Sequence, residues 1–176
     1  MMEKVEIEGI IFNLIDSSPV VILRNGKNKI LPIVVGIPEA QAILFVIEET
    51  SFPRPLTHDL MKNIIGECGW GLLRVEIYSL KKNTYYGRLI LQKDKELIEI
   101  DCRPSDGVAL ALRFKAPILA ESSLLADIEI VKAYEGKTFV KANKLDKPIT
   151  KKEAEAFRKF IENISAKEFW KTLKKE

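Results

Sequence analysis

The sequence predicts the same order of elements twice, and this repeat limits the possible folds more than any other feature. In the first copy, an alternating apolar pattern at residues 5–7 is followed by two apolar runs, 20–24 and 29–35, on either side of Asn25-Gly26. Such runs around Asn-Gly predict a β-hairpin with a type I′ turn. Pro38-Glu39 then marks the start of a helix, because proline is well suited to the first helical turn.

The second copy follows some 67 to 70 residues later. Residues 74–77 alternate, 88–102 predict a hairpin around Lys93-Asp94-Lys95, and a helix begins at Pro104. At an offset of 67 residues, Glu39 in IPEAQAI falls on Asp106 in RPSDGVA, so each copy carries an acid in the first turn of its helix. Hairpins joined through helices predict an α+β fold with an internal strand-hairpin-helix duplication. We expect a largely antiparallel sheet with helices on one face.

A further helix is predicted between the two copies, where the segment PRPLTHDL holds the only histidine of the chain. Thr57 is suited to cap the start of this helix, and the glycines at 66 and 69 to end it. Leu60, Ile64 and Ile65 recur at helical spacing, so we expect them to face the core. His58 is either a proton-transfer group or an ordinary residue of the first turn, and the local pattern leaves both interpretations open.

Length and composition favour one globular domain with a small appendage. The chain has 176 residues, of which 47% are hydrophobic and 30% charged, and this is enough for one well-buried core. The N-terminus lacks the pattern of a signal peptide, and proline and polar residues interrupt the most apolar run, 30–47. We therefore expect a cytoplasmic protein that does not enter a membrane. Cys68 and Cys102 have no metal-binding or paired spacing, and we expect both to be buried thiols.

Charge divides the chain into two parts. From Lys137 onward there are 12 Lys and Arg against 6 Asp and Glu, whereas the preceding residues hold 16 against 19. We therefore separate a domain of residues 1–134 from a basic C-terminal extension of residues 135–176. Capping boxes at 150–153 and 165–168 predict two short helices in this extension. Glutamates between its lysines favour a solvated helical face, and binding of a protein or nucleic-acid partner is the alternative.

Two segments, RPLTHDL and DCRPSD, combine residue types that suit phosphate chemistry. A helix N-terminus offers unpaired N–H groups and a partial positive charge, which attract a phosphate. Arginine can bind a phosphate with two parallel hydrogen bonds. Arg54 and Arg103, together with the hydroxyl of Ser105, are therefore the candidate substrate-binding residues.

The carboxylates of these segments suggest metal binding or acid–base chemistry. Glu39, Asp101 and Asp106 are candidate ligands for a divalent metal, Mg²⁺ or Mn²⁺. His58, Asp59 and Asp106 are candidate catalytic residues, with Asp59 orienting His58 for proton transfer near neutral pH. The structural alternative is that these acids complement the helix dipole and pair with the arginines across the fold.

The stretches GIPEAQAI, RPLTHDLMKNII and IDCRPSDGVALALRFKAPI resemble the core signatures of the bifunctional nuclease domain family, formerly called DUF151. The resemblance covers roughly residues 3–130 and does not include the extension. Cys102 and Gly107 stand where the family usually has alanine. The motif positions in this chain are Glu39, Arg54, Pro55, Thr57, His58, Asp59, Asp101, Arg103, Pro104, Ser105 and Asp106.

The resemblance implies a compact α+β domain that tends to form a dimer, in a family of which some members degrade both RNA and DNA. We therefore expect a homodimeric nuclease that hydrolyses phosphodiester bonds. Two alternatives remain open. One is a non-catalytic homodimeric binding or interaction module, and the other is a nucleic-acid binder without hydrolysis, whose affinity would fall steeply with salt.

Overall fold

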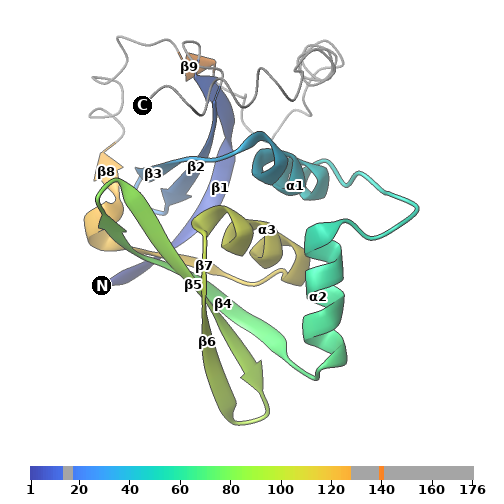
Figure 1. Cartoon of the computed structure of the whole chain (residues 1–176). Helices are drawn as coiled ribbons and strands as arrows, with labels where there is room; N and C mark the ends of the chain where they lie inside the picture. Colours follow the sequence, from blue (N-terminus) through green and yellow to red (C-terminus); the bar gives the residue numbers. More distant parts are fainter. Residues whose placement is uncertain (14–17, 128–138, 141–176) are drawn as a thin grey trace.

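The computed structural model describes residues 1–13, 18–127 and 139–140. One nine-stranded sheet runs through the molecule in the order β6-β5-β4-β7-β1-β2-β3-β8, with β9 also beside β1 (Figure 1). Every neighbouring pair is antiparallel except β4 and β7. The strands are β1 (Met2–Asn13), β2 (Pro19–Asn25), β3 (Lys29–Val34), β4 (Gly71–Lys81), β5 (Thr84–Lys93), β6 (Glu96–Cys102), β7 (Ile118–Glu121), β8 (Ala126–Asp127) and β9 (Phe139–Val140).

Among the described residues, three α-helices complete the α+β fold that the sequence predicted. They are α1 (Ile37–Ile47), α2 (Thr57–Glu67) and α3 (Pro104–Phe114), and a 3₁₀ turn, η1 (Ser122–Leu124), follows β7. Three strands followed by a helix occur twice, as β1-β2-β3-α1 and β4-β5-β6-α3. This matches the expected order of elements. The duplication itself stays a prediction, because order alone does not establish that the two halves superpose.

The core lies between the sheet and two of the helices. α1 contributes Ala40 and Ile43 and α3 contributes Val108 and Leu110, all at most 1% exposed, to one apolar cluster with residues of β2, β3, β4 and β5. Because both helices pack on the same cluster, they hold the two halves of the chain together. Both begin at a proline in the first helical turn, as predicted.

The first hairpin differs from the prediction in its turn. A type I′ turn needs positive φ at both central residues, but Gly26 does not have it, and Asn28 does, at 61°. The loop is therefore three residues long and ends in a left-handed residue, which is a common alternative for hairpins. The side chain of Asn25 fixes this loop by accepting hydrogen bonds from the N–H groups of Lys27 and Lys29, at 3.0 and 2.8 Å.

Helix α2 corrects two predictions. Leu56, not Thr57, is its N-cap, and the Leu56 N–H donates to Oδ2 of Asp59 at 2.9 Å. Leu60 and Ile64, expected in the core, are 53% and 54% exposed. The buried residue of α2 is His58. Ile65, the third residue expected in the core, is partly buried and packs against it. Helical spacing alone therefore did not tell which side of the helix is covered.

Cys68 is exposed rather than buried, and Cys102 is half-buried. None of the helices in the described residues is long and apolar enough to cross a membrane. Within the predicted extension, the structure describes only β9, which pairs with the end of β1. The two helices predicted at 150 and beyond lie outside the described residues.

Candidate functional site

The three helices share one arrangement at their N-termini. Glu39, Asp59 and Asp106 are each the third residue of their helix, and none of the N-cap residues forms a side-chain capping bond. An acid in this position is stabilised by the helix dipole. At α1, the lack of a side chain on Gly36 leaves room for the Glu39 carboxylate, with which an added Cβ would collide.

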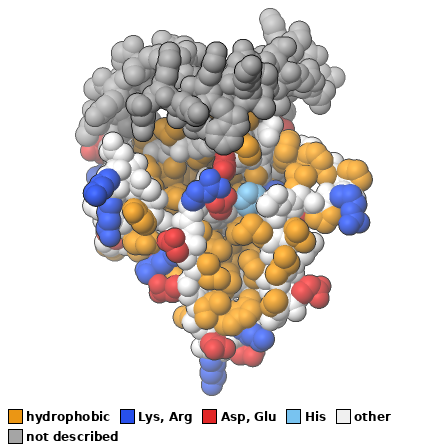
Figure 2. Space-filling model, viewed as in Figure 1, with side chains coloured by type: hydrophobic (Ala, Val, Ile, Leu, Met, Phe, Trp, Pro, Cys, Tyr) orange, Lys and Arg blue, Asp and Glu red, His pale blue; other side chains and the backbone are white. Residues whose placement is uncertain are grey.

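Four residues from these N-termini form what we call the His58 cluster: His58, Asp106, Arg103 and Glu39. Nε2 of His58 lies 3.1 Å from Oδ1 of Asp106. Arg103 donates from Nε to Oδ2 of Asp106 at 2.8 Å, and its Nη1 lies 2.8 Å from Oε1 of Glu39. Figure 2 shows the single histidine at the surface, beside basic and acidic side chains and above an apolar area. The cluster therefore joins all three helices at one accessible point.

The charges in the His58 cluster are set by these contacts. The hydrogen bond from His58 and the pair with Arg103 lower the pKa of Asp106 despite its burial. Asp106 is therefore ionised near neutral pH. Burial, with Asp106 and Asp101 nearby, raises the pKa of Cys102 to about 12, so this thiol is protonated and a poor nucleophile.

His58 is held in a way that suits proton transfer. The residue is 9% exposed and its Nε2 faces a carboxylate. A carboxylate on one ring nitrogen selects the tautomer with the proton there, which leaves the other nitrogen as an acceptor. Nδ1 bonds no described residue. It is therefore the atom of the cluster that can take a proton from water or return one to a leaving group.

Asp59 does not orient His58, contrary to the sequence-based expectation. Its Oδ1 accepts from Nε of Arg113 at 2.6 Å, and its Oδ2 accepts from the Leu56 N–H. Burial raises the pKa of Asp59, but these hydrogen bonds more than offset that effect and lower it. Asp59 thus fixes the start of α2, which places His58, while Asp106 is the direct partner of the ring.

Arg113 is the residue that the sequence analysis missed. Its side chain is 5% exposed, and its Nη1 donates to the carbonyl oxygens of Ala42 and Ala109. It therefore connects α1, α2 and α3. The available signal was an arginine at the end of an otherwise apolar helical stretch, VALALR, because a buried charge needs a partner.

The remaining predicted residues lie apart from the His58 cluster. Arg54 is exposed and forms no ion pair with a described residue. Ser105 is buried in the first turn of α3. Asp101 pairs in register with Arg88, and Cys102 with Gly87. Since successive strand residues point to opposite faces, Asp101 lies on the face of the sheet away from Cys102 and α3.

The predicted metal ligands do not form a binding group in the structure. No set of three or more His, Cys, Asp or Glu among the described residues is placed to hold a metal ion. Glu39 and Asp106 are bridged by the guanidinium of Arg103, a cation already placed between the two carboxylates. Asp101 is on the other face of β6. As arranged here, these residues do not fit a shared metal, and metal binding stays a prediction.

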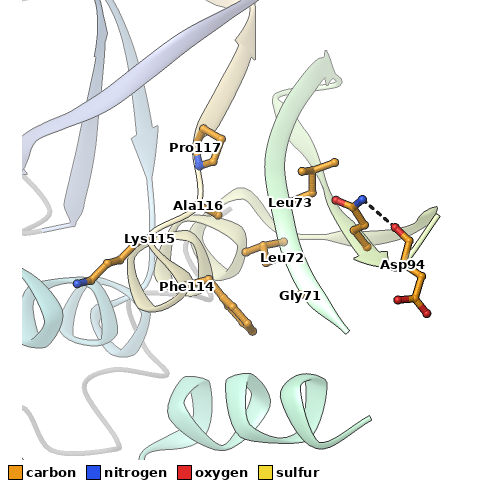
Figure 3. A pocket seen from close by; sticks show the side chains of 9 residues that line it. Gly71, Leu72, Leu73, Asp94, Phe114, Lys115, Ala116 and Pro117 are labelled. Carbon is orange, nitrogen blue, oxygen red and sulfur yellow. Dashed lines mark hydrogen bonds between the residues drawn. The ribbon is translucent and has the colours of Figure 1, made fainter. Parts of the chain in front are cut away.

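Two surface cavities lie near the helices. One, of about 450 Å³, is lined by the start of β4, the end of β5, the last residue of α3, Phe114, and the residues that follow it, including Lys115 (Figure 3). None of the predicted site residues lines it. The other, of about 370 Å³, lies between α1 and the start of α2, and its lining includes Asp59 and Arg113. Neither cavity contains His58, so the candidate site is a surface cluster with a cavity beside it.

Comparison with known proteins identifies one family. A model of the bifunctional nuclease domain matches residues 20–133 of the chain. A protein of Mycobacterium tuberculosis that is called uncharacterized is 33% identical over 169 residues, which are 96% of this chain and 98% of that protein.

Plant proteins match a shorter region. Bifunctional nuclease 1 of Oryza sativa subsp. indica is 30% identical over 115 residues, 61% of this chain and 35% of the rice protein. Bifunctional nuclease 1 of Arabidopsis thaliana is 26% identical over 57% of this chain and 32% of its own length. The chain thus aligns with about a third of each plant protein.

Proposed function

The chain belongs to the bifunctional nuclease domain family, and from this premise we propose that it hydrolyses phosphodiester bonds of RNA and DNA at the His58 cluster. The observation that carries the proposal is the contact between His58 and Asp106, 48 positions apart in sequence. It pairs a proton-transfer group with a carboxylate on a helix N-terminus. The names of the plant relatives support the same reaction.

In this proposal, His58 and Arg103 act directly on the substrate. Nδ1 of His58 accepts a proton from the attacking water as its oxygen bonds to phosphorus, and the proton is then available for the leaving oxygen. Asp106 stabilises the imidazolium that forms and fixes its orientation. Arg103 has a 66% exposed side chain, and its N–H groups that face away from the two acids can contact a phosphate oxygen. Arg54 is a second candidate phosphate ligand, because no described residue neutralises it.

A requirement for Mg²⁺ or Mn²⁺ is a separate proposal, since the described residues form no metal-binding group. Cleavage with added metal and with EDTA tests it without assuming a site. If EDTA stops cleavage, Glu39→Gln and Asp101→Asn identify which predicted ligand takes part.

A second candidate function is a homodimeric interaction module without catalysis. It is favoured by the exposed apolar face of α2, formed by Leu60, Met61 and Ile64, which are 53%, 37% and 54% exposed. Such a group of apolar side chains is typical of an interface. A homodimer is compatible with the nuclease as well. A cytoplasmic location and a protein or nucleic-acid partner for the extension remain proposals from the sequence.

The decisive experiment is cleavage of labelled single-stranded RNA and DNA by the purified protein and matched variants. We expect His58→Ala and Asp106→Asn to lower the rate by about 10²-fold or more, because general acid–base catalysis contributes about that much. Glu96→Gln, at an exposed acid of β6, controls for purification and for a contaminating nuclease. Activity that is equal in all four proteins, or absent in all four, would favour the interaction module.

A further inference from the structure

Arg113 is a buried cation with hydrogen-bond donors that no described residue uses. Its Nε donates to Asp59 and its Nη1 to two backbone carbonyls. An arginine has five N–H donors, and the two on Nη2 have no acceptor within the described part of the chain. The side chain is only 5% exposed. Among the described residues, Arg24 Nε is the one buried side-chain nitrogen or oxygen without a partner, so Nη2 of Arg113 is open to solvent at the cavity that Arg113 lines. Its two donors can therefore bind an acceptor group that enters this cavity.

The surroundings of this guanidinium form a surface cavity that presents an aromatic ring. Arg113 and Asp59 line the cavity of about 370 Å³, which is within the usual size of small-molecule sites, about 300–1,000 Å³. Phe45 and Phe52 also line it, with ring centroids 4.8 Å apart at an angle of 64°. Phe52 is 40% exposed. Aromatic side chains of this kind stack on nucleobases whatever their sequence.

The charges of the cavity favour a base over a phosphate. Glu49 and Asp59 line it against the single cation Arg113, so an anionic group would be repelled. Arg54 lies two residues after Phe52, outside the cavity lining, and is exposed. His58 directly precedes Asp59 on α2. The cavity and the His58 cluster thus lie at the same helix N-terminus, one suited to a base and the other to a phosphate.

We propose that this cavity binds one nucleobase of the substrate strand and prefers guanine. The inference rests on the proposed nuclease function and names the part of the nucleotide that the neighbouring surface recognises. Guanine presents a carbonyl oxygen followed by two adjacent N–H donors along one edge. Nη2 of Arg113 donates to that carbonyl, and the two oxygens of Asp59, each with a second lone pair, accept from the two donors. Adenine, cytosine and uracil cannot make all three contacts.

Binding of free nucleotides tests this site without depending on cleavage. The amide resonances of the full chain are followed by NMR during titration with GMP, AMP, CMP and UMP. We expect GMP to bind about tenfold more tightly than the other three, because the contacts that they lack involve charged groups. The shifts should centre on residues 45–59 and Arg113.

Matched aromatic variants assign the binding to the cavity. Phe52→Ala should weaken GMP binding about tenfold, because it removes the stacking ring, and Phe52→Tyr should restore it. Tyr86→Ala controls for loss of an aromatic ring elsewhere, since Tyr86 is 36% exposed on β5, and it should leave binding unchanged. Three results would overturn the proposal. They are equal affinity for all four nucleotides, chemical-shift changes confined to His58 and Arg103, or a Phe52→Ala variant that binds GMP as tightly as the wild type.

The outcome separates this inference from the proposed function. GMP binding at the cavity by a protein that does not cleave nucleic acid would remove the nuclease function and leave the base site in place. Cleavage by a protein that shows no nucleotide preference would instead remove the base site and leave the nuclease function in place.

Discussion

At the scale of single residues, Arg113 links the three helices that carry the candidate site. Replacing it with Met leaves the Asp59 carboxylate and two backbone carbonyls without their donor. We expect the free energy of unfolding to fall by about 2–4 kcal/mol, less than for a fully buried pair because Asp59 is partly exposed. Arg113→Lys should cost less, since it keeps the charge but loses the forked geometry. Urea denaturation measures both, and a loss below about 0.5 kcal/mol for the Met variant would show that the link is unimportant.

The acids of the molecule predict how its stability depends on pH. Asp106, Asp59 and Glu76 all have a lowered pKa in the folded protein. For Glu76, burial raises the pKa, but hydrogen bonds from Arg74 and Arg88 more than offset it. A group whose pKa is lowered on folding adds stability above its unfolded pKa, about 4 for these acids, and loses it as the pH falls through the folded value.

We therefore expect the unfolding free energy to be steady above about pH 5 and to fall steeply below about pH 4. Denaturation curves from pH 7 to pH 2.5 measure this. Asp106→Asn should be less stable at pH 7 and show a shallower acid decline, because one of the titrating groups is gone. A variant curve that runs parallel to the wild-type curve would contradict the role of Asp106.

The sequence predicted the residues of the site better than their contacts. Glu39 and Asp106 follow a proline at a helix start, so their position in the first turn could be read locally. The partner of His58 could not be predicted from local sequence, because Asp106 is 48 residues away and Asp59 is adjacent. Proximity in sequence favoured Asp59 as the partner of His58. The packing of α2 against α3 instead places the Asp59 carboxylate in a hydrogen bond with Arg113.

At the scale of elements, the packing of α3 on β4 depends on Gly107. An added Cβ would lie 2.8 Å from Cγ1 of Val75 and 3.3 Å from Sγ of Cys102. Val75 is fully buried, so it has little room to move. An alanine at this position would therefore need a smaller neighbour.

We expect Gly107→Ala to lower the unfolding free energy by about 1 kcal/mol. Overpacking costs about 1–3 kcal/mol of stability, and the better helix propensity of alanine offsets up to about 1 kcal/mol of this cost. In a double-mutant cycle, Val75→Ala should cost less in the Gly107→Ala background than alone, because it relieves the contact. Additive effects in thermal or urea denaturation would refute the steric explanation.

Local signals located the helices but not all of their faces. Proline marked the starts of α1 and α3, and both helices bury apolar residues in the core. α2 shows the limit of such signals, because its apolar spacing is regular and yet Leu60 and Ile64 face outward. Periodicity predicts that the apolar face of a helix will be covered. The arrangement of the other elements decides which part of the molecule covers it.

At the scale of the whole molecule, the outward face of α2 predicts self-association. If it forms the interface of a homodimer, the double variant Leu60→Gln with Ile64→Gln should be monomeric, since polar groups disfavour a buried interface. Fold stability should change by less than about 1 kcal/mol, as both side chains are about half exposed. Sedimentation velocity over a range of concentrations measures the state. Leu80→Gln, at an apolar side chain of β4 that is 45% exposed, is the control, and a wild-type protein that stays monomeric would rule out this interface.

The pairing of β1 with β7 has a consequence for synthesis of the chain. Met2 to Val5 pair with Ile118 to Glu121, and β7 also supplies the parallel link to β4. At about 5–20 residues per second, the ribosome needs roughly 6 to 23 s between making the first segment and the second. Until then, β1 can pair with β2 but has an open edge, and the two halves of the sheet have no strand between them. The newborn chain thus passes through a long period in which a chaperone could bind that edge, and the two halves of the sheet are joined only after β7 has been made.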